Sequence, residues 1–425
     1  MRIAGVFLRD FEPIADQLLE FPDKPQTGLA EVHFFVGQNG TGKTRILSLL
    51  AAACGNPQEL LYRTTKTASA VVVDTTIHGD TRFRYFKPNG GFQIGVKVDR
   101  LYADFGKLPS GQGEGTSLHQ LLDGSKVVAM AFRSVPSLED QKVTPMGEVK
   151  WGDRKSFLNF AHHATENTQI CQSLANLKVR MGIVSSDPND RTVRMVHAFD
   201  QAIKRITDRE LLLTVGYVGK EFRLKAKWDG HEIELKQLPD GLRAVVGWLA
   251  SCMAKLDVLY PDVDNPLEQP VILLLDEPDA HLHPAWQRKL IPAVQQLLPN
   301  AQIFIATHSP FVVSSVNHGW IHVFQADEKG VVTIKQAQPC GLGDSYIDVV
   351  EDILGVHEQF DPETEKLLRE FRAKREDFKK QPQDESRLAE AKNLANSIAG
   401  RSQTLAFMMG REIAQIDAQH KKIAG

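Results

Sequence analysis

A glycine-rich segment between an apolar strand and an apolar helix limits most strongly how this chain can fold. Residues 37–44 read GQNGTGKT and match the pattern G-x-x-x-x-G-K-[ST] in full. Residues 31–36 before it predict a buried strand, and residues 44–53 after it predict a helix. In such a unit, backbone N–H groups turn toward phosphate oxygens, and the start of the helix adds positive potential. The sequence therefore predicts an α/β fold with a phosphate-binding loop.

Each residue of this loop has an expected contact. The Lys43 ammonium would reach the β- and γ-phosphates of a nucleotide, and the Thr44 hydroxyl would bind Mg²⁺. The predicted nucleotide-contacting residues are Gly37, Gln38, Asn39, Gly40, Thr41, Gly42, Lys43 and Thr44.

A second apolar strand, residues 271–275, ends in the two carboxylates Asp276 and Glu277. Ligands of open α/β sheets bind beyond the carboxyl ends of the strands, where these acids are expected. We expect Asp276 to hold Mg²⁺, directly or through water. Glu277 would act on the attacking water, a role typically worth ~10²–10⁴-fold in rate. The alternative is a strand followed by an ordinary acidic helix cap.

A histidine follows a third apolar strand, in the segment Thr307-His308-Ser309-Pro310. A lone histidine at such a position is more often a satisfied surface or core residue. Because the two preceding motifs occur in order, we predict that His308 contacts the γ-phosphate or positions the water.

The motif order, with the stretches LLLDEPDAHLHP and ATHSP, resembles the SMC/RecF/OLD branch of ABC ATPases. Within that branch it resembles the ATPase subunits of bacterial antiphage systems of the Septu, retron and PARIS types. The resemblance covers about residues 1–60 and 235–315. It implies ATP and Mg²⁺ as ligands, ATP hydrolysis, and a head with a mixed central sheet, flanking helices and an antiparallel β subdomain. It also implies a homodimer or higher homo-oligomer that encloses ATP between one phosphate loop and the partner's signature motif.

The segment LPDGLR, residues 238–243, stands where the resembled family has its signature motif. The resemblance implies that Asp240, Gly241 and Arg243 contact the partner's nucleotide, and glycine would permit close backbone approach. Pro239 replaces the serine that the family often has, so one hydroxyl contact is missing. The alternative interpretation is a turn with a helix cap.

Two other motifs depart from the resembled pattern. Arg133 and Ser134 stand where a glutamine usually follows the strand VVAMAF, and Gln141 is a weak substitute. His281 and His283 are expected at the dimer interface, with a metal pair as the alternative, although helical metal pairs favour an i, i+4 spacing. His162-His163 is predicted to lie at the surface.

The patterning divides the chain into four segments. We predict a first lobe with the phosphate loop (1–134), a mostly helical insertion (135–210), a second lobe with the remaining motifs (211–345) and a helical C-terminal region (346–425). Residues 69–104 predict a β-meander with a turn at Asn89-Gly90-Gly91. The best predicted helices are residues 193–207 and 242–259.

The C-terminal region contains two predicted amphipathic helices between residues 361 and 400. Each has an apolar stripe that needs a covering surface. Either the stripes fold back on the head as ordinary core, or one of them docks a second subunit or an effector. The stripes are Leu367, Phe371 and Phe378 on the first helix, and Leu388, Leu394 and Ile398 on the second.

Composition narrows the setting. The net charge of -3 excludes a global basic field for nucleic acid. The four cysteines form no C-x-x-C pair and indicate a reducing compartment. There is no signal peptide and no apolar stretch of about 18 residues, so we expect a cytoplasmic protein without a membrane contact.

Three functions remain open at this stage. The first is an ATPase subunit whose dimerisation senses or gates a separate effector, a nuclease in antiphage defence, because the segment after Pro310 has no Asp-x-Asp pair of its own. The second is a DNA-repair or chromosome-type head that acts on nucleic acid directly, although the insertion lacks a coiled-coil arm. The third is the nucleotide-binding subunit of a transporter, although a closer signature motif would be usual there.

Overall fold

The computed structural model describes residues 2–23, 28–56, 69–75, 81–87, 91–95, 128–133, 141–144, 146–151, 157–158, 160, 164–184, 187–341, 345–356, 358–381 and 383–424. The turn residues Asn89 and Gly90, Ser134 and the pair His162-His163 lie outside them. The chain forms two compact units, residues 1–354 and 355–425. The four-segment division remains a prediction.

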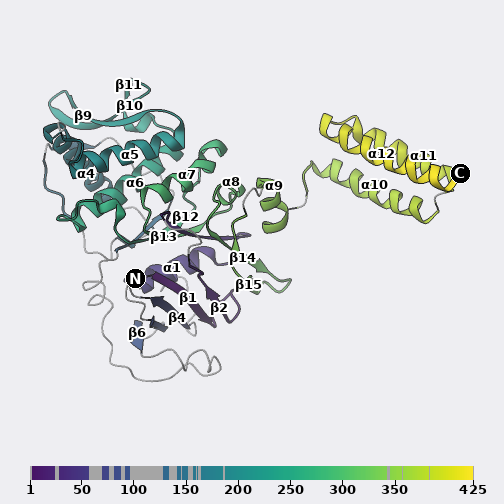
Figure 1. The fold of residues 1–425 in the computed structure, drawn as a ribbon, viewed down its shortest axis with the longest axis horizontal. Coiled ribbons are helices and arrows are strands. Elements are labelled where there is room, and N and C mark those ends of the chain that lie inside the picture. Colours follow the sequence, from purple (N-terminus) through teal and green to yellow (C-terminus); the bar gives the residue numbers. More distant parts are fainter. Residues whose placement is uncertain are drawn as a thin grey trace. The chain divides into compact units, whose positions relative to one another are not determined.

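A mixed sheet forms the centre of the first unit (Figure 1). Its four inner pairings, β14 with β3, β3 with β13, β13 with β12 and β12 with β7, are all parallel. Strand β7 forms one edge of the sheet, and at the opposite edge β15 and β16 pair antiparallel with β14. The strands are β3 (Glu31–Gly37), β7 (Val128–Arg133), β12 (Val271–Asp276), β13 (Ala301–Ala306), β14 (Trp320–Ala326), β15 (Val332–Ile334) and β16 (Gln338–Pro339).

Alternate residues of the central strands enter two different cores, because successive side chains of a strand point to opposite faces. Leu273 and Leu275 of β12 pack with the core that contains helix α6 (Asp240–Leu259). Ile272 and Leu274 pack with the core that contains helix α1 (Lys43–Ala53). Both faces are buried, which explains why these strands read as continuous apolar runs.

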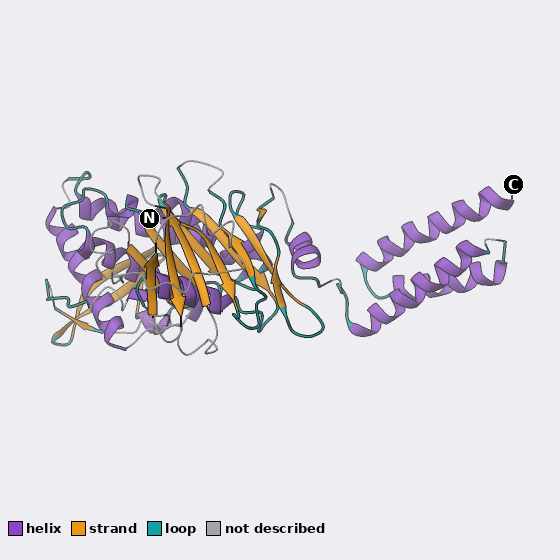
Figure 2. Cartoon of the chain, turned by 90° about the horizontal axis from the view of Figure 1, so that it is seen from below, coloured by secondary structure: helices purple, strands orange, loops and turns teal. Residues whose placement is uncertain are grey.

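Helices lie against both faces of this sheet: in the view of Figure 1, α6 lies above β12 and β13, and α1 lies below them. Figure 2 shows the same sheet from below. Helix α1 contacts β12 and β13 on one face. The helices that the structure describes in the first unit are α1 (Lys43–Ala53), α4 (Ala164–Val184), α5 (Arg191–Thr207), α6 (Asp240–Leu259), α7 (Pro284–Leu297), α8 (Pro310–Val313) and α9 (Tyr346–Asp348), with short helical turns at Leu235–Gln237, Pro266–Glu268 and Val349–Ile353.

Two further sheets occur in the described part of the first unit. One is an antiparallel sheet in the order β2-β1-β4-β5-β6, with β1 (Arg2–Arg9), β2 (Gln17–Glu20), β4 (Ser69–Thr75), β5 (Thr81–Lys87) and β6 (Gly91–Gly95). The other contains β8 (Lys142–Val143), β9 (Leu211–Val218), β10 (Glu221–Trp228) and β11 (His231–Ile233). The predicted α/β head, with its mixed sheet, antiparallel β subdomain and helical insertion, is confirmed.

The described residues of the second unit form three helices, α10 (Pro362–Lys380), α11 (Glu385–Ala399) and α12 (Gln403–Ala424). Its core contains Phe371, Phe378 and Ile398 together with Leu405, Met409 and Ile416 of α12. The other stripe residues, Leu367, Leu388 and Leu394, pack against the same core. The stripes of the two predicted helices are therefore covered by each other and by a third helix, an arrangement that neither sequence-based alternative included.

None of the helices that the structure describes is both long enough and apolar enough to cross a membrane.

Candidate active site

The phosphate-binding loop lies at the carboxyl edge of the central sheet, between β3 and α1. Gly40 and Gly42 have φ angles of 82° and 94°, a conformation that side chains with a Cβ disfavour. Gly42 is the N-cap of α1, so the loop turns directly into the helix start. The structure thus places the loop as the sequence predicted, at a helix N-terminus suited to anions.

Lys43 is bent back onto this loop. Its Nζ donates to the carbonyl oxygens of Gly37 at 2.9 Å and Gln38 at 2.8 Å. Burial lowers the pKa of Lys43 to about 8, although the nearby carboxylates of Glu277 and Asp276 act in the opposite direction. A phosphate group would offer this ammonium a stronger acceptor than two neutral carbonyls.

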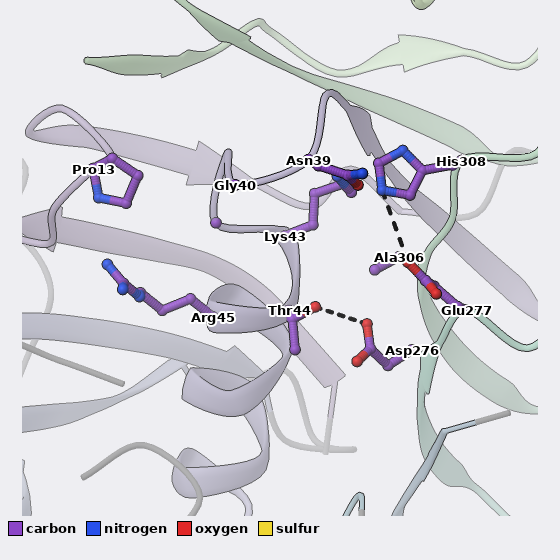
Figure 3. Close-up of a pocket in the computed structure, with 11 residues that line it drawn as sticks. Pro13, Asn39, Gly40, Lys43, Thr44, Arg45, Asp276, Glu277, Ala306 and His308 are labelled. Atoms are coloured by element: carbon purple, nitrogen blue, oxygen red, sulfur yellow. Dashed lines mark hydrogen bonds and ion pairs between the residues drawn. The ribbon is translucent and has the colours of Figure 1, made fainter. Parts of the chain in front are cut away.

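Thr44 and Asp276 meet across the gap between α1 and β12 (Figure 3). The Thr44 hydroxyl donates to Asp276 Oδ1 at 2.8 Å, and the Asp276 side chain is only 4% exposed. A hydroxyl and a carboxylate are hard oxygen donors, the type that Mg²⁺ prefers. These two residues therefore fit a magnesium ion.

Arg133 completes the surroundings of Asp276. Its Nε and Nη2 donate to Asp276 Oδ2 at 2.9 Å and 2.6 Å. The sequence indicated only that Arg133 stands in place of a glutamine, and gave it no partner. Because β7 and β12 are parallel neighbours in which Arg133 pairs with Asp276, the shared position at two strand ends was the available signal.

Glu277 and His308 face the same space from neighbouring strand ends (Figure 3). His308 Nε2 lies 3.8 Å from Glu277 Oε1, beyond hydrogen-bond distance but within that of an ion pair. Burial, aided by the Lys43 charge, lowers the pKa of His308, which favours the neutral form of its imidazole. Glu277 has a φ of 50°, in the left-handed region, and its side chain is half exposed.

Asp279 and Thr307 form a second contact that the sequence did not predict. The Thr307 hydroxyl donates to Asp279 Oδ1 at 2.8 Å. Asp279 is buried, and burial raises its pKa to about 6, against the lowering effect of the Thr307 hydrogen bond. The pair links the segment after β12 to the segment after β13.

Lys43, the Thr44–Asp276 pair, Glu277 and His308 line one cavity of about 340 Å³. The lining residues are Pro13, Asn39, Gly40, Gly42, Lys43, Thr44, Arg45, Asp276, Glu277, Ala306 and His308. The cavity joins an ammonium, a hydroxyl–carboxylate pair, a half-exposed carboxylate and a neutral imidazole.

The signature-like segment is not part of this cavity. Asp240 and Arg243 form an ion pair of 2.6 Å at the start of α6, and Gly241 is buried. A Cβ on Gly241 would lie 2.5 Å from the His281 carbonyl oxygen. The close approach that requires glycine is therefore made by the chain's own backbone.

The remaining candidates have other surroundings. Gln141 lies 3.5 Å from the Thr168 hydroxyl and does not line the cavity. His283 is the N-cap of α7, and its Nδ1 accepts from the Ala285 N–H at 3.2 Å. Among the described residues, no group of three or more His, Cys, Asp or Glu is placed to hold a metal ion.

The fold and this cavity define an α/β P-loop protein with the motif order of ABC/SMC-type ATPases. A family model described as "AAA domain, putative AbiEii toxin, Type IV TA system" matches residues 175–314. The "Retron Vc95 probable ATPase" of Vibrio cholerae serotype O1 biovar El Tor is 34% identical over 95 residues, 22% of this chain and 18% of that protein. The "Septu protein PtuA" of Bacillus thuringiensis is 34% identical over 103 residues, 24% of this chain and 26% of that protein.

The chain thus spans only about a fifth to a quarter of the length of these curated relatives. Among solved structures, the SMC head domain from Thermotoga maritima aligns with a TM-score of 0.43 and 16% identity, over 80% of this chain and 100% of that one. The predicted resemblance to ATPase subunits of the retron and Septu types is confirmed by these relatives.

Proposed function

We propose that this chain binds ATP with Mg²⁺ in the cavity and hydrolyses ATP to ADP and phosphate. The observation that carries the proposal is the convergence of Lys43, the Thr44–Asp276 pair and Glu277 with His308 in one cavity. The fixed groups match the needs of phosphoryl transfer, which depends mainly on positioning and charge stabilisation.

Different residues of the chain would bind the phosphates, hold the metal and act on the water. Lys43 exchanges its two carbonyl acceptors for phosphate oxygens, and the loop N–H groups and the start of α1 complement the remaining charge. Thr44 and Asp276 would hold the metal, which would supply positive charge to offset that of the phosphate groups. Glu277 accepts the proton of the attacking water, and the neutral His308 donates a hydrogen bond to the γ-phosphate or to that water.

Glu277→Gln tests this assignment. The amide retains the shape of the side chain but cannot accept the proton, so hydrolysis should slow by roughly 10²-fold or more while ATP binding persists. Phosphate release and isothermal titration measure the two quantities. Undiminished turnover would remove Glu277 from the role of base, and loss of ATP affinity would show that it binds rather than catalyses.

We further propose that ATP joins two copies of the chain, because Asp240, Gly241 and Arg243 lie outside the cavity of their own subunit. The slowed Glu277→Gln variant should therefore accumulate as an ATP-dependent dimer in light scattering. A variant that binds ATP and stays monomeric would contradict the sandwich arrangement.

The nucleotide state would gate a separate effector, a nuclease in antiphage defence. Support comes from the relatives, which are named as proteins of retron and Septu systems. Co-purification of the full chain with the product of the adjacent reading frame, with and without ATP, tests this step. A partner that binds equally in both states would contradict gating.

A further inference from the structure

Arg133 holds the carboxylate that the proposed function assigns to the metal. It is the last residue of β7 and pairs in register with Asp276, the last residue of β12. Its guanidinium donates twice to Asp276 Oδ2, while Thr44 donates to Oδ1. Both oxygens of Asp276 are therefore engaged by the chain's own donors.

The burial of the two partners differs. The Asp276 side chain is 4% exposed, and a buried carboxylate without a counter-charge is costly. The Arg133 side chain is 40% exposed, so the guanidinium can move toward solvent without crossing the core. A cation that binds Asp276 while Arg133 remains on Oδ2 would also meet a repelling charge at close range.

We propose that Arg133 is a counter-ion latch on Asp276. It neutralises this carboxylate in the metal-free site and opposes the binding of a divalent cation alone. It releases Asp276 when a polyphosphate supplies another anion for the guanidinium, which pairs well with phosphate oxygens. The release step rests on the proposed nucleotide function. Glutamine, which the resembled family usually has near this point, is uncharged and cannot act in this way.

Binding of Mn²⁺ without nucleotide, measured on the full chain by electron paramagnetic resonance, tests the latch. Arg133→Gln should bind Mn²⁺ at least about tenfold more tightly than the unmodified chain, because a charge repelling the metal is removed. Arg194→Gln is the matched control, since Arg194 is 37% exposed and also pairs with an aspartate, Asp264. It loses one positive charge away from the cavity and should leave the affinity unchanged. Equal affinities of Arg133→Gln and the unmodified chain would overturn the latch.

Melting temperature provides a readout that does not require metal affinity. In EDTA, Arg133→Gln should melt below the unmodified chain because Asp276 loses its counter-charge, and the double variant Arg133→Gln/Asp276→Asn should recover most of the loss. This comparison decides the question even if the single variant folds poorly. A double variant no more stable than the single one would mean that the two residues are not a counter-ion pair.

Repeating the Mn²⁺ measurement with ATP distinguishes a failure of the latch from a failure of the proposed nucleotide function. With saturating ATP, the unmodified chain and Arg133→Gln should bind Mn²⁺ with similar affinity, since the guanidinium has then left Asp276. A tenfold difference that persists with ATP would contradict the release step. If the chain binds no ATP at all, the proposed function fails, while the nucleotide-free arm still decides whether Arg133 competes with the metal.

Discussion

At the scale of single residues, the lowered pKa of Lys43 makes ATP affinity depend on pH. Only the protonated amine attracts phosphate, and with a pKa of about 8 its protonated fraction falls as pH rises through that value. The affinity for ATP, measured by isothermal titration, should be about tenfold weaker at pH 9 than at pH 7.5. Lys43→Arg, which retains its charge over this range, should show no such slope. A flat profile for the unmodified chain would mean that Lys43 remains fully protonated there.

Asp279 gives a second pH dependence, in stability. Its pKa in the folded chain, about 6, is above the ordinary value of 3.8, so the folded state holds the proton more tightly. The resulting stabilisation is complete below about pH 3.8 and is lost as pH rises through about 6. Asp279→Asn stays neutral and still accepts from Thr307, so at pH 7.5 it should be more stable, by up to about 3 kcal/mol.

Urea denaturation of the full chain at pH 5 and pH 7.5 measures this difference. The variant's gain should be larger at the higher pH. Asp264→Asn, at a residue whose side chain is 83% exposed, is the control and should change little. If Asp279→Asn proved less stable than the unmodified chain at pH 7.5, the carboxylate would be serving as an ionised partner instead.

The sequence predicted the residues whose spacing is set by a continuous motif. Lys43 and Thr44 belong to one loop, and Asp276 follows an apolar strand, so their contacts could be anticipated from linear order. The Arg133–Asp276 and Asp279–Thr307 contacts depend on which strands are neighbours and in what register. That information comes from tertiary packing, which linear spacing does not contain.

At the scale of elements, the start of α6 is fixed by its contact with the segment after β12. A Cβ on Gly241 would lie 2.5 Å from the His281 carbonyl oxygen and 2.8 Å from the Leu282 nitrogen. Gly241→Ala should therefore destabilise the fold by about 1–3 kcal/mol, because backbone must shift to admit the methyl group. Thermal denaturation measures this loss.

A matched glycine lies in α4. A Cβ on Gly182 would meet no heavy atom within 4 Å, so Gly182→Ala should not lower stability, and alanine is the better helix former. Equal stability of both variants would show that the α6 contact is loose. Since a Gly241 substitution disturbs its own subunit first, Asp240, with 66% of its side chain exposed, is the better position to test for contact with a partner.

Helices and strands were predicted correctly where the apolar pattern along the sequence was uninterrupted. The predicted helix at residues 242–259 is observed at Asp240–Leu259, and the apolar strand at residues 271–275 at Val271–Asp276. Helix α12 was not predicted as a separate element, although the region was expected to be helical. Its exposed face includes Phe407 and Met408, so its polar and apolar positions do not separate cleanly along the chain.

At the scale of the whole molecule, each of the two compact units has a core of its own. The stripes of α10 and α11 are covered by residues of the same unit, including Leu405, Met409 and Ile416 of α12. The apolar surface that sequence reasoning offered to the head or to a partner is thus already used within residues 355–425. The first unit contains the central sheet and every residue that lines the cavity.

Ending the chain after Leu354 tests this independence. The shortened protein should retain its melting temperature within a few degrees and its ATP affinity within about threefold, because a core that loses no side chain loses no transfer free energy. The complementary fragment, residues 355–425 alone, should show a cooperative helical melt in circular dichroism, since three helices enclose one apolar core. A shorter fragment, residues 355–380, is the contrasting control. It contains only α10, so it would expose Phe371 and Phe378 and should be less soluble. Aggregation of residues 1–354 would mean that the head needs the C-terminal helices as a cover, as one of the two sequence-based alternatives held.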